Sequence, residues 1–208
     1  MTPVKKIIVV FLVLTAFAIP LIYATIRGND REIQYQRSII SSYTFYEEPQ
    51  QEETNRPPFR FKKMIISPLA TFSIRARILS RENYYLDPAS KISPIDLAMG
   101  WGRMADSIIY EALNISQSSR FYRYSWKGQP PIPLAEIIGS SANMHLIPAD
   151  KLVEKALERA KKGKFIRIKG LLVEVNDESG WTWRSSLTRS DTGAGACEVI
   201  FVEAAFVE

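Results

Sequence analysis

An uncharged run of 20 residues, Ile7–Ile26, constrains this chain more than any other feature of its sequence. The run reads IIVVFLVLTAFAIPLIYATI, and a helix of that length spans about 30 Å, the thickness of the hydrocarbon core of a bilayer. Lys5 and Lys6 precede the run, and positive charge of this kind stays on the cytoplasmic side. The sequence therefore predicts a single-pass protein of the inner (cytoplasmic) membrane, with a cytoplasmic N-terminus and a periplasmic or extracellular C-terminal domain.

A cleaved signal peptide is the alternative interpretation of this run. The apolar core of a signal peptide is usually about 7–15 residues long and ends at a small-residue cleavage site. The run here is longer, and only Ile22-Tyr23-Ala24 resembles such a site. We therefore expect a retained signal anchor, with cleavage as the alternative.

The chain after the anchor has the length of one domain and a linker. Of 208 residues about 180 follow the run. Residues 27–58 are polar and rich in acids, Gln and Pro, which predicts a tether that holds the domain off the membrane. The expected organisation is a cytoplasmic tail at 1–6, the anchor at 7–26, the tether at 27–58 and an extracytoplasmic domain at 59–208.

Charge and metal-ligand content exclude several classes of function. The 27 basic and 22 acidic residues give a net charge of +5, and two of the basic residues are the lysines before the anchor. The remaining +3 is too small to indicate a nucleic-acid partner. His145 and Cys197 are the only histidine and cysteine, so the monomer cannot form a disulfide or a structural zinc site of four such ligands. We expect no metal and no cofactor.

Two stretches carry helix signals. Asp150 to Lys162 has an apolar stripe at helical spacing, and Gly163 follows it. Ser93-Pro94-Ile95-Asp96 combines a capping serine, a proline suited to the first turn and an acid that favours the helix dipole. Apolar residues then recur at helical spacing at Leu97, Trp101, Met104 and Ile108.

Strand patterns cover much of the remainder. Thr71–Leu79 alternates between apolar and polar residues, as a half-buried strand does. In Phe165–Val175 the apolar positions change parity at Gly170, and a β-bulge there would place both sets on one buried face. Two turn sequences then separate three strands, which predicts a C-terminal meander. The fold class expected after the transmembrane helix is α+β, with a small bent antiparallel sheet or partly closed barrel and a few helices.

Three blocks of the sequence carry a resemblance to a known family. SPIDLAMGWGRMAD, SSANMHLIPAD and WRSSLTRSDTGAGACE are similar to blocks in uncharacterised single-pass envelope proteins of bacteria. The resemblance covers most of residues 60–208. It implies a bacterial envelope protein and brings no known activity or catalytic residue with it.

Polar residues near His145 form the first candidate site. A serine, an asparagine and a histidine close together can hold an anion or a carbonyl group, and an arginine adds bidentate hydrogen bonds. The expected ligand-binding residues are Ser141, Asn143, His145, Arg189 and Asp191. A hydrolase using the His145 region is one alternative, although no G-x-S-x-G elbow is present. A structural histidine that pins a loop to the sheet is another.

Two further motifs match known chemistry, and each also has a structural explanation. Asp191-Thr192-Gly193-Ala194 matches the short signature of aspartic proteases, but a second copy is absent and a hairpin turn explains the same residues. Cys197 and His145 could form a thiolate–imidazole pair across the fold. A buried and inert Cys197 is the alternative, because an apolar strand pattern follows it.

The segment RFYRYSWK predicts a strand with an aromatic and basic surface. Its candidate residues are Arg120, Tyr122, Arg123, Tyr124 and Trp126. Aromatic rings beside cations stack on nucleic-acid bases, and they also bind sugars and peptides. The alternative is that this face packs into the core.

Taken together, these patterns favour a membrane-anchored extracytoplasmic binding or assembly module of the bacterial envelope, without catalysis and with a protein partner in the envelope. An envelope hydrolase using the His145 region is the alternative from another class. A nucleic-acid-binding module using the Arg120–Lys127 strand is the third possibility.

The topology can be tested with reporter fusions. A C-terminal alkaline phosphatase fusion should be active, because that enzyme folds productively only after export. A C-terminal fluorescent protein that requires the cytoplasm should be dark. The reverse pattern would contradict the predicted orientation.

Overall fold

The computed structural model describes residues 48–193 and 195–208, together with 18–20, 22, 25, 27, 28, 30, 31, 34 and 38. Most of the predicted anchor lies outside these residues, so the orientation in the membrane stays a prediction. Among the described residues no helix is both long enough and apolar enough to cross a membrane.

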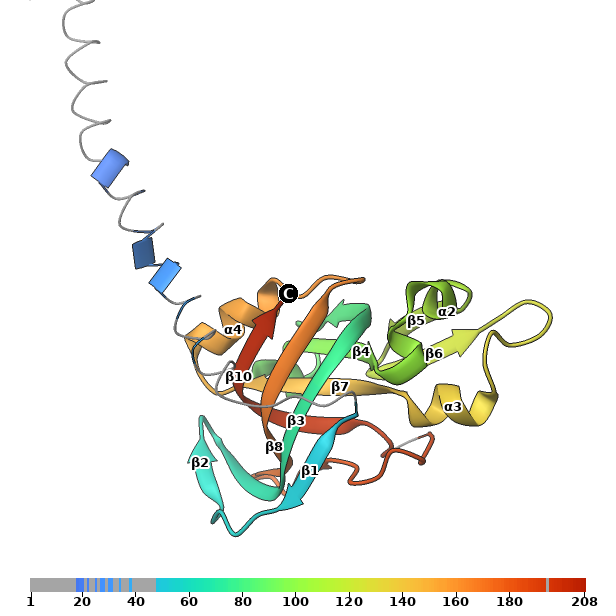
Figure 1. Cartoon of the computed structure of the whole chain (residues 1–208). Helices are drawn as coiled ribbons and strands as arrows, with labels where there is room; N and C mark the ends of the chain where they lie inside the picture. The colour runs from blue at the N-terminus through green and yellow to red at the C-terminus, as the bar shows by residue number, and fades with distance from the viewer. Residues whose placement is uncertain are drawn as a thin grey trace, which may run out of the picture.

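The domain is α+β, with most of its ordered residues in a sheet (Figure 1). The strands are β1 (Gln50–Glu53), β2 (Phe59–Phe61), β3 (Met64–Asn83), β4 (Ile95–Gly100), β5 (Asn114–Ser118), β6 (Phe121–Ser125), β7 (Ser141–Pro148), β8 (Phe165–Asp177), β9 (Thr182–Arg184) and β10 (Glu198–Val207). The helices are η1 (Pro88–Lys91), η2 (Gly102–Ala105), α2 (Ser107–Glu111), α3 (Leu134–Gly139) and α4 (Lys151–Glu158).

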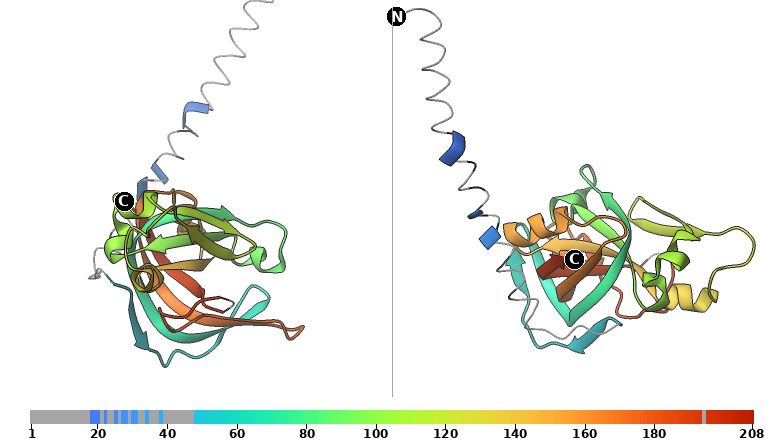
Figure 2. Two further views of the ribbon diagram at one scale, coloured as in Figure 1. Left: turned by 90° about the vertical axis from the view of Figure 1, so that its right-hand side faces the viewer. Right: turned by 45° about the horizontal axis from the view of Figure 1, so that its top comes forward.

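Five strands of the main sheet form a closed barrel. The pairing order runs β3-β4-β7-β10-β8 and returns to β3, because β3 pairs with β4 along one part of its length and with β8 along another. All of these pairs are antiparallel except β7 with β10, which is parallel. The strands therefore curve around a common interior (Figure 2). The hairpin β5–β6 forms a separate two-stranded sheet beside this barrel.

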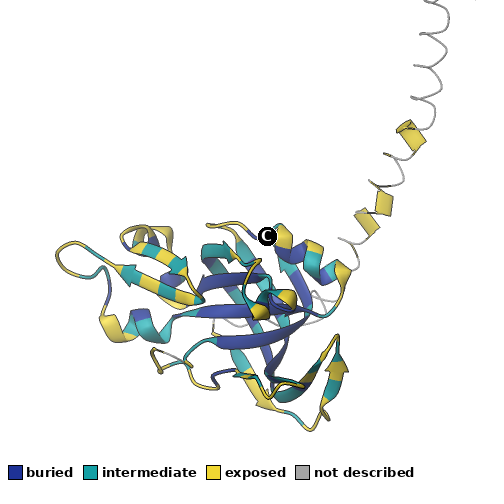
Figure 3. Cartoon of the chain, turned by 180° about the vertical axis from the view of Figure 1, so that it is seen from behind, coloured by how far each residue is buried: buried dark blue, intermediate teal, exposed yellow. Residues whose placement is uncertain are grey.

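The alternation predicted for Thr71–Leu79 is confirmed within β3. Phe72, Ile74, Ala76 and Ile78 are all buried in the main core cluster. The inward faces of β4, β7, β8 and β10 supply most of the remaining core, which appears as the dark blue strands at the centre of Figure 3. The apolar period of two therefore defines the interior of the barrel.

The helix predicted from Asp150 is confirmed as α4. The Asp150 carboxylate accepts hydrogen bonds from the backbone amides of Leu152 and Val153, at 2.8 and 2.9 Å, and so caps the first turn. The helix ends at Glu158, well before Gly163. Arg81 of β3 donates to the Glu158 carbonyl at 2.7 Å, which satisfies an acceptor that the helix end leaves open.

The helix predicted from Ser93 is wrong, because Ile95–Gly100 forms the strand β4. All six of its residues are buried, since β4 lies between β3 and β7 and apolar clusters cover both of its faces. A strand buried on both sides has a continuous apolar sequence that its periodicity cannot distinguish from a helix.

The bulge predicted at Gly170 is also wrong, because β8 alternates regularly through this residue. Ile168 points into the main core, whereas Leu171 belongs to a second cluster on the outside of the barrel. The register shifts instead occur in the partner strands, at Glu203 of β10 and at Leu69 of β3. Both faces of β8 are buried, so the sequence has apolar residues at even-numbered positions on one face and at odd-numbered positions on the other.

The C-terminal strands do not form the predicted meander. β8 lies between β9 and β10, so β9 and β10 are not neighbours in the sheet. At the N-terminal end of the domain, β1 lies within the segment 27–58 that we expected to be a tether, and it pairs with β3. Ordered pairing in the described chain therefore starts at Gln50.

A substitution at Gly170 tests how closely β8 and β10 approach each other. A Cβ atom at Gly170 would lie 2.1 Å from the Phe201 carbonyl oxygen, which is backbone and cannot rotate away. We therefore expect Gly170→Ala to lower the free energy of unfolding by about 3 kcal/mol, measured by urea denaturation. Gly139→Ala is the matched control, because nothing lies within 4 Å of its added Cβ. Equal unfolding free energies for the two variants would contradict the close approach.

Candidate functional site

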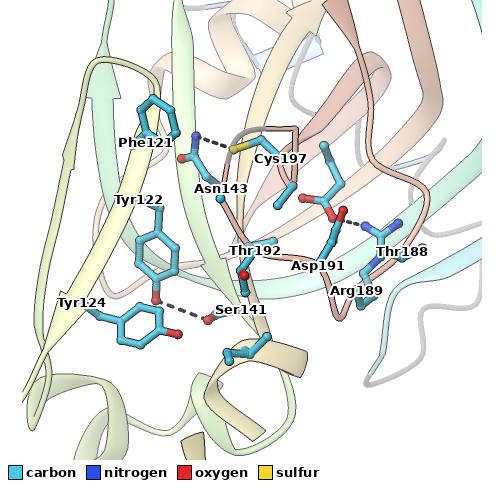
Figure 4. A pocket seen from close by; sticks show the side chains of 15 residues that line it. Phe121, Tyr122, Tyr124, Ser141, Asn143, Thr188, Arg189, Asp191, Thr192 and Cys197 are labelled. Atoms are coloured by element: carbon cyan, nitrogen blue, oxygen red, sulfur yellow. Dashed lines mark hydrogen bonds and ion pairs between the residues drawn. The ribbon is translucent and has the colours of Figure 1, made fainter. Parts of the chain in front are cut away.

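A pocket of about 210 Å³ opens between the β5–β6 hairpin and the barrel (Figure 4). Three segments that are distant in sequence form its walls: strand β6, the start of β7, and the loop from β9 into β10. Its polar and aromatic lining includes Tyr122, Tyr124, Ser141, Asn143, Arg189, Asp191, Cys197 and Glu198. We refer to it below as the hairpin pocket.

The structure brings together four of the five predicted ligand-binding residues. Ser141 and Asn143 enter the hairpin pocket from β7, and Arg189 and Asp191 enter it from the loop. His145 is not among the lining residues. A ligand for this site remains a prediction.

The hairpin wall carries the aromatic residues. Tyr122 and Tyr124 of β6 and Trp126 just after it form a row of rings, with centroids 5.4 Å apart for the first pair and 6.4 Å for the second. The Tyr122 hydroxyl donates to Ser141 Oγ at 3.3 Å, and burial raises the pKa of this tyrosine. The face predicted to be aromatic therefore turns toward the barrel and is half-buried (Figure 3).

Arg120 holds this wall in place. Its guanidinium donates to Asp96 on β4 at 2.7 Å and to Asp87 before η1 at 2.9 Å. It also stacks 3.8 Å above the ring of Tyr84. Arg120 was predicted to offer a basic surface, but its charge is already compensated by the two carboxylates.

The turn between β5 and β6 is conformationally unusual. Ser119 and Arg120 have φ angles of 51° and 69°, in the left-handed region that favours glycine. Hydrogen bonds hold this geometry: the Arg120 amide donates to the Tyr84 hydroxyl at 2.9 Å, and its carbonyl accepts from Asn143 Nδ2 at 3.0 Å. The tip of the hairpin is therefore fixed against the barrel wall.

Arg123, the other predicted cation of this segment, lies on the opposite side of β6. It donates to Ser118 Oγ at 2.8 Å, next to the exposed ring of Phe121. The stacking of nucleic-acid bases uses aromatic rings with free cations beside them. Neither Arg120 nor Arg123 provides such a cation beside the Tyr122–Trp126 face.

His145 lies on the same outer side of β7 as Asn143, two residues further along the strand, and does not line the hairpin pocket. It is 2% exposed, its Nδ1 lies 2.8 Å from Asp96 Oδ2, and its ring is 4.6 Å from the ring of Trp183. Ser141 Oγ donates instead to the Ile137 carbonyl at 2.7 Å. The Ser141 hydroxyl is therefore not placed against this histidine, as a nucleophile–base pair would require.

Cys197 lies in the hairpin pocket beside Asn143, whose Nδ2 is 3.7 Å from the sulfur. Burial raises the pKa of the thiol to about 11. The thiol is therefore protonated at neutral pH, and the thiolate needed for nucleophilic attack is scarce.

Asp191 belongs to a loop and not to the end of an apolar strand. Its Oδ2 accepts a hydrogen bond from Ser186 Oγ at 2.7 Å, and Gly193 has a φ angle of 86°. A glycine with positive φ is typical of a turn. The geometry around Asp191-Thr192-Gly193 is thus that of a turn, and Ala194 lies outside the described residues.

Glu198 is the most unusual group in the hairpin pocket. It is 1% exposed at the first position of β10, and Arg189 forms an ion pair with its Oε1. Arg189 also donates to Gln51 of β1 at 2.8 Å, so its guanidinium connects the loop to both β10 and β1. The second oxygen of Glu198, Oε2, is buried and makes no hydrogen bond within the described part of the chain.

Sequence reasoning did not select Glu198 or Gln51. A signal for Glu198 does exist, since a carboxylate at the head of the apolar strand EVIFV has to be buried with it. Gln51 gave no such signal, because it lies in a polar segment whose pairing with β3 depends on the folded barrel.

Comparison with known proteins adds no relative: no protein-family model, curated protein or solved structure matches the chain. Among the described residues no group of three or more His, Cys, Asp and Glu side chains could hold a metal ion. The residues that line the hairpin pocket offer hydrogen bonding, charge and aromatic contact.

Glu198 should make stability depend on pH. Burial raises its pKa to about 8, against the lowering effect of Arg189. Its ordinary pKa is about 4.3, so between these values the folded state binds more protons than the unfolded state. The stabilisation is complete at pH values below about 4 and disappears as the pH rises through about 8.

We therefore compare the wild type with Glu198→Gln, which cannot ionise. From pH 5 to pH 8.5 the wild type should lose on the order of 3 kcal/mol of unfolding free energy relative to the variant. Urea denaturation at several pH values measures this difference. Parallel stability curves for the two proteins would show that Glu198 is ionised in the folded state throughout this range.

Proposed function

We propose that this chain is a non-catalytic binding or assembly module of the bacterial envelope, held in the inner membrane by Ile7–Ile26 with its domain outside the cytoplasm. The observation that carries the proposal is the hairpin pocket. It is a concave site with an aromatic wall and a few convergent polar groups, which is the usual form of a ligand-binding site.

The composition of the pocket supports binding over catalysis. The thiol of Cys197 has a raised pKa, and the hydroxyl of Ser141 is bonded to a backbone carbonyl. The histidine that would act as a base is buried against Asp96 further along β7 and does not line the pocket. The groups that line the pocket can therefore recognise a ligand, but none of them is activated as a nucleophile.

The connectivity of the barrel supports the same proposal. If β3, β4, β7, β8 and β10 are numbered one to five in chain order, their order around the barrel is one-two-three-five-four. The third and fifth strands are parallel, and α4 lies between the third and the fourth in the sequence. This connectivity is that of the OB-fold, which binds ligands on its second and third strands and on the loop between its fourth and fifth. The hairpin pocket uses β7 and the loop before β10, the corresponding positions. The likeness concerns topology, and the site itself has to specify the ligand.

The proposal can be tested by filling the pocket. Thr192 is exposed and lines the pocket, so Thr192→Trp should occupy it without disturbing the core. A chemically diverse panel of small molecules and short peptides should contain compounds that raise the melting temperature of the wild type and leave that of Thr192→Trp unchanged.

Thr182→Trp is the matched control, because Thr182 is also exposed but lies on β9 outside the pocket. It should respond to the same compounds as the wild type. If every stabilising compound also stabilises Thr192→Trp, the hairpin pocket is not the binding site. If no compound in the panel stabilises the wild type, the binding function is contradicted.

A further inference from the structure

We infer that the hairpin pocket takes a protonated primary amine on a short alkyl chain, seated between the carboxylates of Glu198 and Asp191 and the ring of Tyr124. This inference rests on the proposed binding function and specifies the class of ligand. It departs from the sequence-based expectation that Arg189 would attract an anionic or carbonyl ligand.

In its ionised form Glu198 leaves one unused hydrogen-bond acceptor in the pocket. Glu198 Oε2 is buried and receives no hydrogen bond from the described residues, and a buried acceptor without a donor is costly. Two of the nearby donors bond elsewhere: Asn143 Nδ2 donates to the Arg120 carbonyl, and Ser141 Oγ donates to the Ile137 carbonyl. A ligand that supplies N–H groups would satisfy what the pocket lacks.

The charge of the pocket points the same way. Its charged lining residues are Arg189, Asp191 and Glu198. The pKa of Glu198 stays raised, at about 8, despite the ion pair with Arg189, because the effect of burial outweighs that of the arginine's charge. Arg189 is already bound to Glu198 and to Gln51. An ammonium group beside Glu198 would be a second cation in the site. It would stabilise the ionised form of Glu198 and balance the two carboxylates.

The aromatic wall and the size of the pocket limit what carries the amine. Phe121, Tyr122 and Tyr124 lie across the pocket from Asp191 in Figure 4. Aromatic faces attract cations and cover alkyl chains. The volume of about 210 Å³ lies below the range of about 300–1,000 Å³ that drug-sized ligands occupy. It suits a single chain the size of a lysine side chain.

Isothermal titration of the purified full-length chain tests this directly. The probes are 1,5-diaminopentane and its neutral counterpart 1,5-pentanediol. A capped peptide with one lysine and the same peptide with norleucine form the second pair. The amine of each pair should bind and the neutral partner should bind at least tenfold more weakly. Tighter binding of the diamine or of the peptide distinguishes a free amine from a lysine side chain as the natural ligand.

The variants locate the binding in the pocket. Glu198→Gln should weaken amine binding at least tenfold. The matched control is Glu203→Gln, which makes the same change on the same strand. Glu203 pairs with Arg56 outside the pocket, so this variant should bind amines as the wild type does. Asp191→Asn gives a second measurement on an exposed residue and should also weaken binding. It keeps the test decisive if Glu198→Gln does not fold.

Equal affinity for an amine and its neutral partner would overturn the inference, as would unchanged affinity in both Glu198→Gln and Asp191→Asn. Absence of amine binding, together with compounds that stabilise the wild type but not Thr192→Trp, would reject the amine and keep the binding function. Failure of both experiments would reject the two proposals together.

Discussion

The closure of the sheet through β3 is the constraint on which the rest of the structure depends. β3 is 20 residues long, and its two partners β4 and β8 would otherwise be open edges with unsatisfied backbone groups. Within the closed sheet the start of β10 pairs in parallel with β7 from Met144 onward. The pocket residues of these two strands become neighbours only because the ring is closed.

Two arginines then fix the two walls of the pocket to the barrel. Arg120 attaches the β5–β6 hairpin to Asp96, and Arg189 attaches the loop before β10 to Glu198. Both acids are almost completely buried. Burying such pairs contributes little net stability, but removing one partner leaves a buried charge and is strongly destabilising. The pairs therefore determine where the hairpin and the loop lie, and so determine the shape of the site.

Much of the fold and part of the site could be predicted from local pattern. The inward face of β3 and the capped helix after Asp150 follow from residues within a few positions of one another. Ser141 and Arg189 were expected to share a site, and they do line one pocket. The helix expected from Ser93 failed for a physical reason: capping signals are local, whereas burial on both faces of β4 depends on neighbours that are distant in sequence.

The sequence by itself determined the apolar N-terminal run, the α+β content and the residue types available for binding, because these depend on composition and short-range period. Only the tertiary structure decided which of them act together. It turned His145 outward against Asp96, and it left Glu198 Oε2 buried in the pocket with no donor among the described residues. These outcomes depend on the register of β4, β7 and β10, and strand register is set by long-range pairing that no local pattern contains.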